Sequence, residues 1–229
     1  MEGAVEPLAP EPWPLHILGL ISPSLVIAGN LLGGVYTLLG VVFIWVVGPI
    51  LDLAMGESNT IRPPRDSGTP FTTLLWAHGV IHFAMMGTFF IFAFSEGLTV
   101  WLIAASLSTG LAAAASAIVT AHELGHQRPR SPGWRLARLL LFSINYPHFT
   151  TEHNHNHHRN VATDEDPASA RVEEGIWSFW FRTIPGQFSS SVRIPVSYTH
   201  LRAHETPEHR GLRRGGEKKK GGGGGGGGG

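Results

Sequence analysis

Long runs of apolar residues dominate the first half of the chain. Four of them, near residues 15–32, 35–55, 71–94 and 98–121, approach or exceed the ~20 residues that an α-helix needs to cross a bilayer. Almost no charged residue falls inside these runs. Buried in a soluble bundle, they would need a larger water-facing shell than this chain supplies. The pattern therefore predicts four membrane-spanning helices.

Two weaker apolar segments follow the four runs. We expect residues 136–149 to form a partial or re-entrant helix. In residues 172–188, aromatic side chains are interleaved with charged ones. This mixture fits a helix in the membrane interface, where Trp is favoured, or an amphipathic helix packed on the protein. The predicted fold class is all-α: a polytopic membrane helical bundle with about four complete spans and a partial or re-entrant helix.

The two ends of the chain differ from this apolar body. Residues 1–14 hold acidic residues and prolines and are expected to form a flexible leader, so that residues 15–196 make up the membrane domain. Residues 197–229 contain every lysine of the chain and end in a run of glycines. We expect 197–229 to be an artefactual, disordered tail. The alternative is a further metal motif formed by His200 and His204.

Composition and charge narrow the choice of function. The chain has no cysteine, which excludes disulfides, iron–sulfur clusters and thiolate chemistry. Its formal net charge is zero, so nothing in the charge balance indicates a nucleic-acid partner. Arginines gather between the second and third runs and after the fourth. Because cytoplasmic loops carry the excess of positive residues, we expect both segments to face the cytoplasm.

Histidines concentrate after the fourth run: seven of the thirteen lie from His122 to His158. His122 and His126 are four residues apart, so on a helix they share one face. His153 and His157 repeat this spacing, and His158 adds a third imidazole beside them. Five imidazoles exceed the three protein ligands of a typical catalytic zinc and are better matched to two metal ions.

Carboxylates near these histidines are candidates to form hydrogen bonds with the metal-ligating imidazoles. A ligating imidazole commonly donates its second ring N–H to such a carboxylate. We expect Glu123, Glu152 and Asp166 to serve in this way, with Asp164 and Glu165 as further candidates. For any one of them, the alternative is a solvated acidic turn.

Two more histidines, His78 and His82, lie four apart inside the third run. Ionisable residues within a membrane span are functional candidates by default. We expect neutral imidazoles that form hydrogen bonds across helices. The alternative is that they line a substrate channel.

Three motifs resemble those of the integral-membrane alkane 1-monooxygenases, which are relatives of the membrane fatty-acid desaturases and xylene monooxygenases. The resemblance covers residues 15–196. It rests on His122-Glu-Leu-Gly-His126, on Pro147-His148-Phe149, and on Glu152-His-Asn-x-x-His-His158 followed by Val161-Ala-Thr-x-Glu-Asp-Pro-Ala-Ser-Ala-Arg171.

The resemblance implies a cofactor, a reaction and partners. The cofactor would be two non-haem iron ions, and the reaction would be terminal hydroxylation of alkanes to 1-alcohols with O2. Electrons would come from rubredoxin and its NAD(P)H-dependent reductase. The protein would sit in a bacterial inner membrane. The implied iron ligands are His122, His126, His153, His157 and His158.

The sequence departs from the family pattern at several points. Asn156 stands where glycine is usual, Gln127 where a basic residue is usual, and Asp164 where proline is usual. His148 and His155 are not at ligand positions. The family's later segment, with one more ligand histidine and a final His-x-x-His-His block, does not appear. We therefore expect a C-terminally truncated member that is inactive by itself.

Other functions use the same residues differently. A membrane fatty-acid or lipid desaturase or hydroxylase would have similar histidine motifs. An intramembrane zinc protease would use His122, Glu123 and His126 alone, and would leave the second histidine group without a role. A histidine-rich metal transporter or sensor would place ligands within the spans. Metal analysis separates an oxygenase of the alkane-hydroxylase type from the zinc protease: two irons against one zinc.

Overall fold

The computed structural model describes residues 9–10, 12–56, 62–63 and 65–203. Within these residues every regular element is a helix and no strand occurs, which confirms the all-α prediction. The chain divides into two compact units, residues 1–150 and 151–229. Residues 1–8 and 11 of the predicted leader and 204–229 of the predicted tail lie outside the described residues.

Four helical segments in the first unit are long and apolar enough to cross a membrane. They confirm the four predicted spans, and the protein is a multi-pass membrane protein. The first is Trp13–Leu32, made of η1 (Trp13–Leu20) and α1 (Ile21–Leu32). The second is Gly34–Met55, made of η2 (Gly34–Leu38), α2 (Leu39–Val42), the π-helix η3 (Phe43–Val47) and α3 (Gly48–Met55). The third is α4 (Thr69–Glu96), and the fourth is Val100–Gly125, made of α5 (Val100–Ala112), the π-helix η4 (Ala113–Ile118) and α6 (Val119–Gly125).

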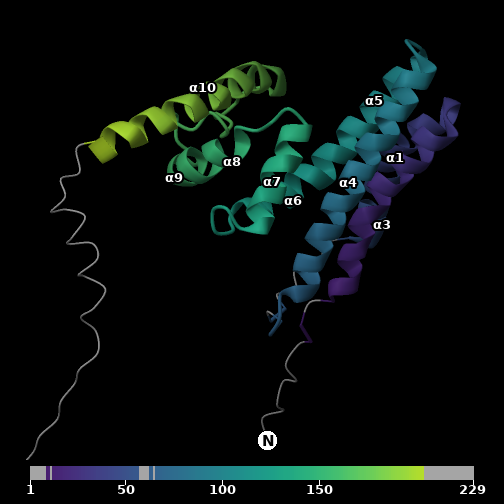
Figure 1. Ribbon diagram of the computed structural model, residues 1–229, viewed down its shortest axis with the longest axis horizontal. Coiled ribbons are helices and arrows are strands. Elements are labelled where there is room, and N and C mark those ends of the chain that lie inside the picture. Colours follow the sequence, from purple (N-terminus) through teal and green to yellow (C-terminus); the bar gives the residue numbers. More distant parts are fainter. Residues whose placement is uncertain (1–8, 11, 57–61, 64, 204–229) are drawn as a thin grey trace, which may run out of the picture. The chain divides into compact units, whose positions relative to one another are not determined.

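Helices α1, α4 and α5 pack side by side in the first unit (Figure 1). Small residues let the second span approach them closely. A Cβ at Gly40 would lie 2.5 Å from Val26 Cγ2 and 2.9 Å from Ser108 Cβ. Ser108 then donates a hydrogen bond of 2.5 Å to the carbonyl oxygen of Thr37. Close backbone approach with polar contacts between helices is typical of membrane bundles.

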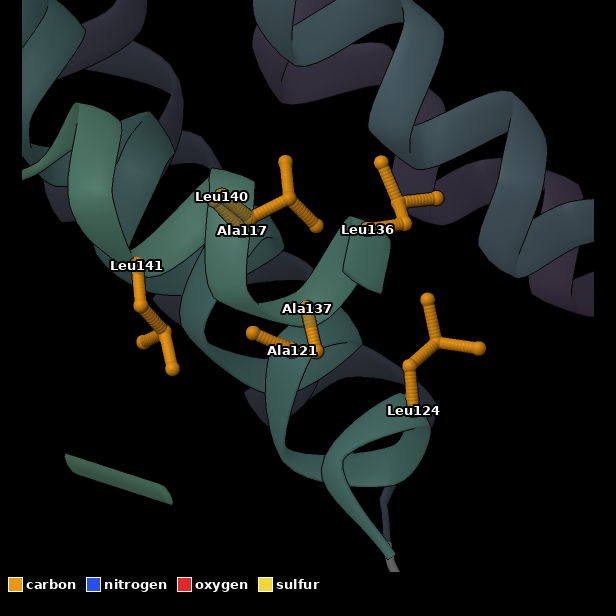
Figure 2. Packing of buried hydrophobic residues seen from close by; sticks show 7 residues of the cluster. All are labelled: Ala117, Ala121, Leu124, Leu136, Ala137, Leu140 and Leu141. Carbon is orange, nitrogen blue, oxygen red and sulfur yellow. The ribbon is translucent and has the colours of Figure 1, made fainter. Parts of the chain in front are cut away.

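Helix α7 (Pro132–Ser143) packs against α6 and η4, and Figure 2 shows the apolar side chains where these helices meet. The helix begins where Ser131 accepts a hydrogen bond from the backbone N–H of Trp134, with Pro132 at the first helical position. This core holds the end of the fourth span in place beneath the first histidine pair. Its members are Ala117, Ala121, Leu124, Leu136, Ala137, Leu140 and Leu141.

The bounds predicted for this helix, 136–149, are wrong at both ends. Asn145 adopts a left-handed conformation with φ 58°. Its N–H bonds to the carbonyl oxygen of Phe142, and the N–H of Tyr146 bonds to that of Leu141, which is a Schellman termination. At 12 residues the helix is about 18 Å long, which is short of the ~30 Å hydrocarbon core. It is therefore a partial helix, as predicted, but displaced along the chain.

The second unit is built around a long helix. Helix α8 (Phe149–Glu152) leads into the π-helix η5 (His153–His157) and the short α9 (His158–Asn160), and α10 (Ile176–Ala203) packs against η5. Arg182 of α10 holds the intervening loop. It donates to the carbonyl oxygens of Pro167 and Ser169 and to the carboxylate of Glu174 at 2.6 Å.

Helix α10 continues to Ala203 and so includes the first residues of the segment 197–229. The prediction that this segment is a disordered tail stays a prediction.

Candidate metal centre

His122 and His126 lie at the end of α6 with their rings edge to face. Their Nε2 atoms are 3.3 Å apart, which confirms the shared helix face predicted from the spacing. Imidazole nitrogens bind first-row metals at ~2 Å, so two nitrogens on one ion lie roughly 3 Å apart. The pair therefore has the separation that a single ion requires.

The three histidines of the second unit are grouped by a π-helical turn. The rings of His153 and His158 are 4.4 Å apart between centroids, and one nitrogen of each lies within 4.8 Å of the other. His157 stacks on His153 at 5.2 Å. In a regular α-helix, residues four apart share a face, which would pair His153 with His157. The wider π-helical turn brings residues five apart onto one side and so pairs His153 with His158. Such π turns occur frequently at functional sites.

Asp166 fixes the orientation of His157. Its Oδ2 lies 2.8 Å from His157 Nδ1 and accepts a 2.5 Å hydrogen bond from Ser169, while Oδ1 accepts from the N–H of Ala168. The side chain is 1% exposed. Burial alone would raise the pKa of Asp166, but the hydrogen bonds from Ser169, Ala168 and His157 outweigh it and hold the pKa below its usual range.

The ionised Asp166 favours the proton on His157 Nδ1. His157 Nε2 is then the nitrogen left for a metal ion. This carboxylate–histidine arrangement is typical of metal-ligating imidazoles.

Glu152 and Asn156 form a second polar network beside the π turn. Glu152 is buried and accepts a 2.7 Å hydrogen bond from the amide of Asn156, whose oxygen accepts another from Asn160. Burial raises the pKa of Glu152 more than the Asn156 hydrogen bond lowers it. Asn156 lies within the helix and is held by these bonds, so its side chain is accommodated where the family pattern expects glycine.

The remaining predicted acidic residues are more exposed. Glu123 Oε1 lies 3.4 Å from His122 Nδ1, within reach as an acceptor for that ring. Asp164 instead pairs with Arg171 at 3.6 Å. Of the histidines outside the expected ligand set, His155 lines a pocket of about 730 Å³ formed mostly by polar residues, and His148 packs edge-on against Tyr146. Burial lowers the pKa of His148.

His78 and His82 form the hydrogen bonds across helices that we expected. His78 Nδ1 lies 2.6 Å from Ser116 Oγ, and His82 Nε2 lies 2.8 Å from Ser143 Oγ. His78 also lines an open cavity of about 590 Å³ between η1, α4 and the fourth span. Its walls are mostly apolar, and Glu123, the neighbour of His122, is one of the lining residues. Channel lining and helix bonding are therefore compatible roles for His78.

Sequence reasoning missed two supports of this site. Ser169 was quoted only as part of a motif, yet it bonds directly to Asp166. Arg182, one of the charged residues in segment 172–188, closes the loop that carries Asp166. A serine three residues after an aspartate was the available signal for the first. The second depends on how the loop folds back on α10.

The sequence is similar to a known protein family and to several curated relatives. The family model described as fatty acid desaturase matches residues 97–216. The chain is 34% identical over 146 residues to alkane 1-monooxygenase 1 of Alcanivorax borkumensis, which covers 61% of this chain and 36% of the relative. It is 31% identical over 173 residues to alkane 1-monooxygenase of Ectopseudomonas oleovorans, which covers 73% and 40%.

A third relative, alkane 1-monooxygenase of Pseudomonas putida, is 33% identical over 157 residues, 65% of this chain and 38% of the relative. The chain thus spans about two fifths of the length of the curated relatives it matches. The family match covers just over half of the chain and contains both histidine groups, and the chain therefore belongs to the fatty acid desaturase family.

Proposed function

We propose that this chain is part of a membrane alkane hydroxylase, which converts alkanes to 1-alcohols with O2 at a histidine-ligated non-haem di-iron site. The similarity to alkane 1-monooxygenases supports the reaction. The observation that carries the metal site is the 2.8 Å contact between His157 and the buried, ionised Asp166. Such a pair orients an imidazole for a metal, and ligating histidines usually have a partner of this kind.

The donor set fits iron. Neutral imidazoles suit iron as well as zinc and copper, and the chain offers two groups of them with no thiolate. In this proposal the ligands are His122, His126, His153, His157 and His158. Bound iron would supply the activation of O2. Asp166 holds His157 in one tautomer, and Glu123 is placed to do the same for His122.

The open cavity beside α6 is proposed to receive the alkane. An alkane dissolves in the bilayer, and a mostly apolar cavity between spans offers it apolar contacts. His78, tied to Ser116, and Gly19 form one wall. The residues that line the cavity orient the alkyl chain and exclude water, which limits side reactions at the metal.

The proposal includes a location and electron donors. The arginines between spans two and three and after span four support a bacterial inner-membrane protein whose histidine segment faces the cytoplasm. Electrons would come from rubredoxin and its reductase, as the family resemblance implies. A reporter fused after Arg138 should read out as cytoplasmic, and a periplasmic readout would reverse the topology.

Desaturation or hydroxylation of a lipid chain is the second candidate. The matched family is described as fatty acid desaturase, and the cavity wall carries polar groups from His16, His78 and Ser116. A zinc protease explains less, because it leaves Asp166 and the second histidine group unused.

The test uses a chimera, because the chain spans only part of its relatives. Residues 1–196 are joined to the C-terminal part of the Alcanivorax borkumensis relative and expressed in membranes with iron, rubredoxin and reductase. Conversion of an n-alkane to its 1-alcohol is expected. Unsaturated lipid without alcohol would favour the second candidate, and peptide cleavage with bound zinc the protease. The same assay checks the expectation that residues 1–229 alone are inactive.

A further inference from the structure

The outer face of α10 carries a continuous apolar stripe. Six large side chains recur every three or four residues along the helix, so they share one face. Each is between 49% and 81% exposed. They are Trp177, Trp180, Phe181, Ile184, Phe188 and Val192.

The opposite face of α10 is already covered by protein. A Cβ at Gly186 would lie 2.8 Å from Pro167 Cβ, so the loop packs directly on this side of the helix. Thr183 is buried, and Arg182 is bonded to the loop. The apolar stripe is therefore the face that α10 turns away from its own unit. We propose that α10 lies in the interface of the lipid bilayer, with this stripe among the acyl chains.

Charge and aromatic content point to lipid as the occupant of this face. From Ile176 to Ala203 the helix contains arginines and no acidic residue. Helix α10 itself therefore adds no negative charge that anionic lipid headgroups would repel. Trp177 and Trp180 pack edge to face at 5.4 Å. Tryptophan pairs an apolar ring with an N–H donor and is enriched at the membrane–water boundary.

The helix lies on the bilayer and does not cross it. Among the described residues, the helices that qualify as membrane spans are the four of the first unit, and α10 is not one of them. Arg182 and Arg193 fall within its length, on the side away from the stripe. An apolar face opposed to a polar one is the pattern of interfacial helices. The four spans already commit the protein to a membrane, so the bilayer surface is available to this helix.

The absence of cysteine allows a direct test by single-cysteine spin labelling. The full chain is reconstituted into vesicles of zwitterionic and anionic phospholipid with a label at Phe181→Cys or Phe188→Cys. The matched control is Ser189→Cys, next to Phe188 but on the polar face. Collision with O2, which concentrates in lipid, is compared with collision with a water-soluble nickel chelate by electron paramagnetic resonance.

Labels at 181 and 188 should collide more with O2 than with the chelate, and the label at 189 should show the reverse. A label at 181 that collides mainly with the chelate would place the stripe in water and overturn the inference. Weak collision with both reagents would overturn it too, because the stripe would then be covered by protein. The measurement needs neither metal nor activity, so its outcome is independent of the proposed function.

Discussion

His157 Nδ1 lies 2.8 Å from Oδ2 of Asp166, which is nine positions further along the chain, after the π-helix η5. The contact connects Asp166, in the motif Val161–Arg171, to a proposed metal ligand. Ser169 and the N–H of Ala168 hold the carboxylate on its other sides. A histidine whose Nδ1 is fixed in this way presents Nε2 in one direction.

Replacing Asp166 by Asn should weaken the metal site without unfolding the loop. The amide keeps the size of the side chain but loses the charge that fixes the His157 tautomer. Loss of such a partner typically costs ~10–100-fold in metal affinity or activity. Iron affinity measured by competition with a chelator tests this in the chimera. Asp164→Asn is the control because Asp164 is 88% exposed, and an equal loss in both variants would contradict the role of Asp166.

The Glu174–Arg182 pair should make the second unit acid-sensitive. The hydrogen bond from Arg182 lowers the pKa of Glu174 to about 2. A depressed carboxylate pKa stabilises the fold above the unfolded value of ~4.3, and that stability is lost as pH falls from there towards 2. Thermal unfolding of the wild type and Glu174→Gln, measured from pH 7 to 2, should show a difference that shrinks over this window. A difference that stays constant with pH would show that the charge contributes nothing.

Gly19→Val should narrow the proposed alkane cavity. A Cβ at Gly19 would already lie 3.2 Å from the His78 ring, which Ser116 holds in place. Turnover of longer alkanes by the chimera should fall more than turnover of shorter ones. Gly87→Val is the control, since a Cβ there meets nothing within 4 Å. Unchanged chain-length selectivity in Gly19→Val would remove this cavity from the substrate path.

Leu140→Ala should destabilise the packing of α7 beneath the first histidine pair. Leu140 is fully buried in the core of Figure 2, whereas its neighbour Leu139 is 58% exposed. Truncating a buried leucine costs about 2–5 kcal/mol, and the Leu139→Ala control should cost far less. Unfolding of the purified protein in detergent measures both. Similar losses would mean that α7 is not packed as described.

The spans were predictable because the bilayer sets the length of an apolar helix. The His122–His126 pair was predictable because a four-residue spacing on a helix is local geometry. The register of α7 was misjudged because the apolar run continues past Asn145, where a left-handed residue ends the helix. The start signal, Ser131 followed by Pro132, was present in the sequence.

Other features do not follow from residue spacing. Whether His153 pairs with His157 or His158 depends on a π-helical turn. Such a turn changes which backbone groups hydrogen-bond to one another, and the residue pattern does not predict it. The link between Arg182 and the loop that carries Asp166 appears only once α10 and the loop pack together. The side-chain partner of Asn156 likewise depends on the burial of Glu152.

The metal content of the chimera tests the central claim most directly. We expect two irons per chain in the parent and in His155→Ala, because His155 lies outside the proposed ligand set. His122→Ala and His157→Ala should each lower iron content together with alkane hydroxylation. Loss of a residue that hydrogen-bonds a metal ligand typically costs ~10–100-fold in metal affinity or activity, and loss of a ligand itself should cost at least as much. A single zinc per chain, or unchanged iron and turnover in both ligand variants, would contradict the di-iron assignment.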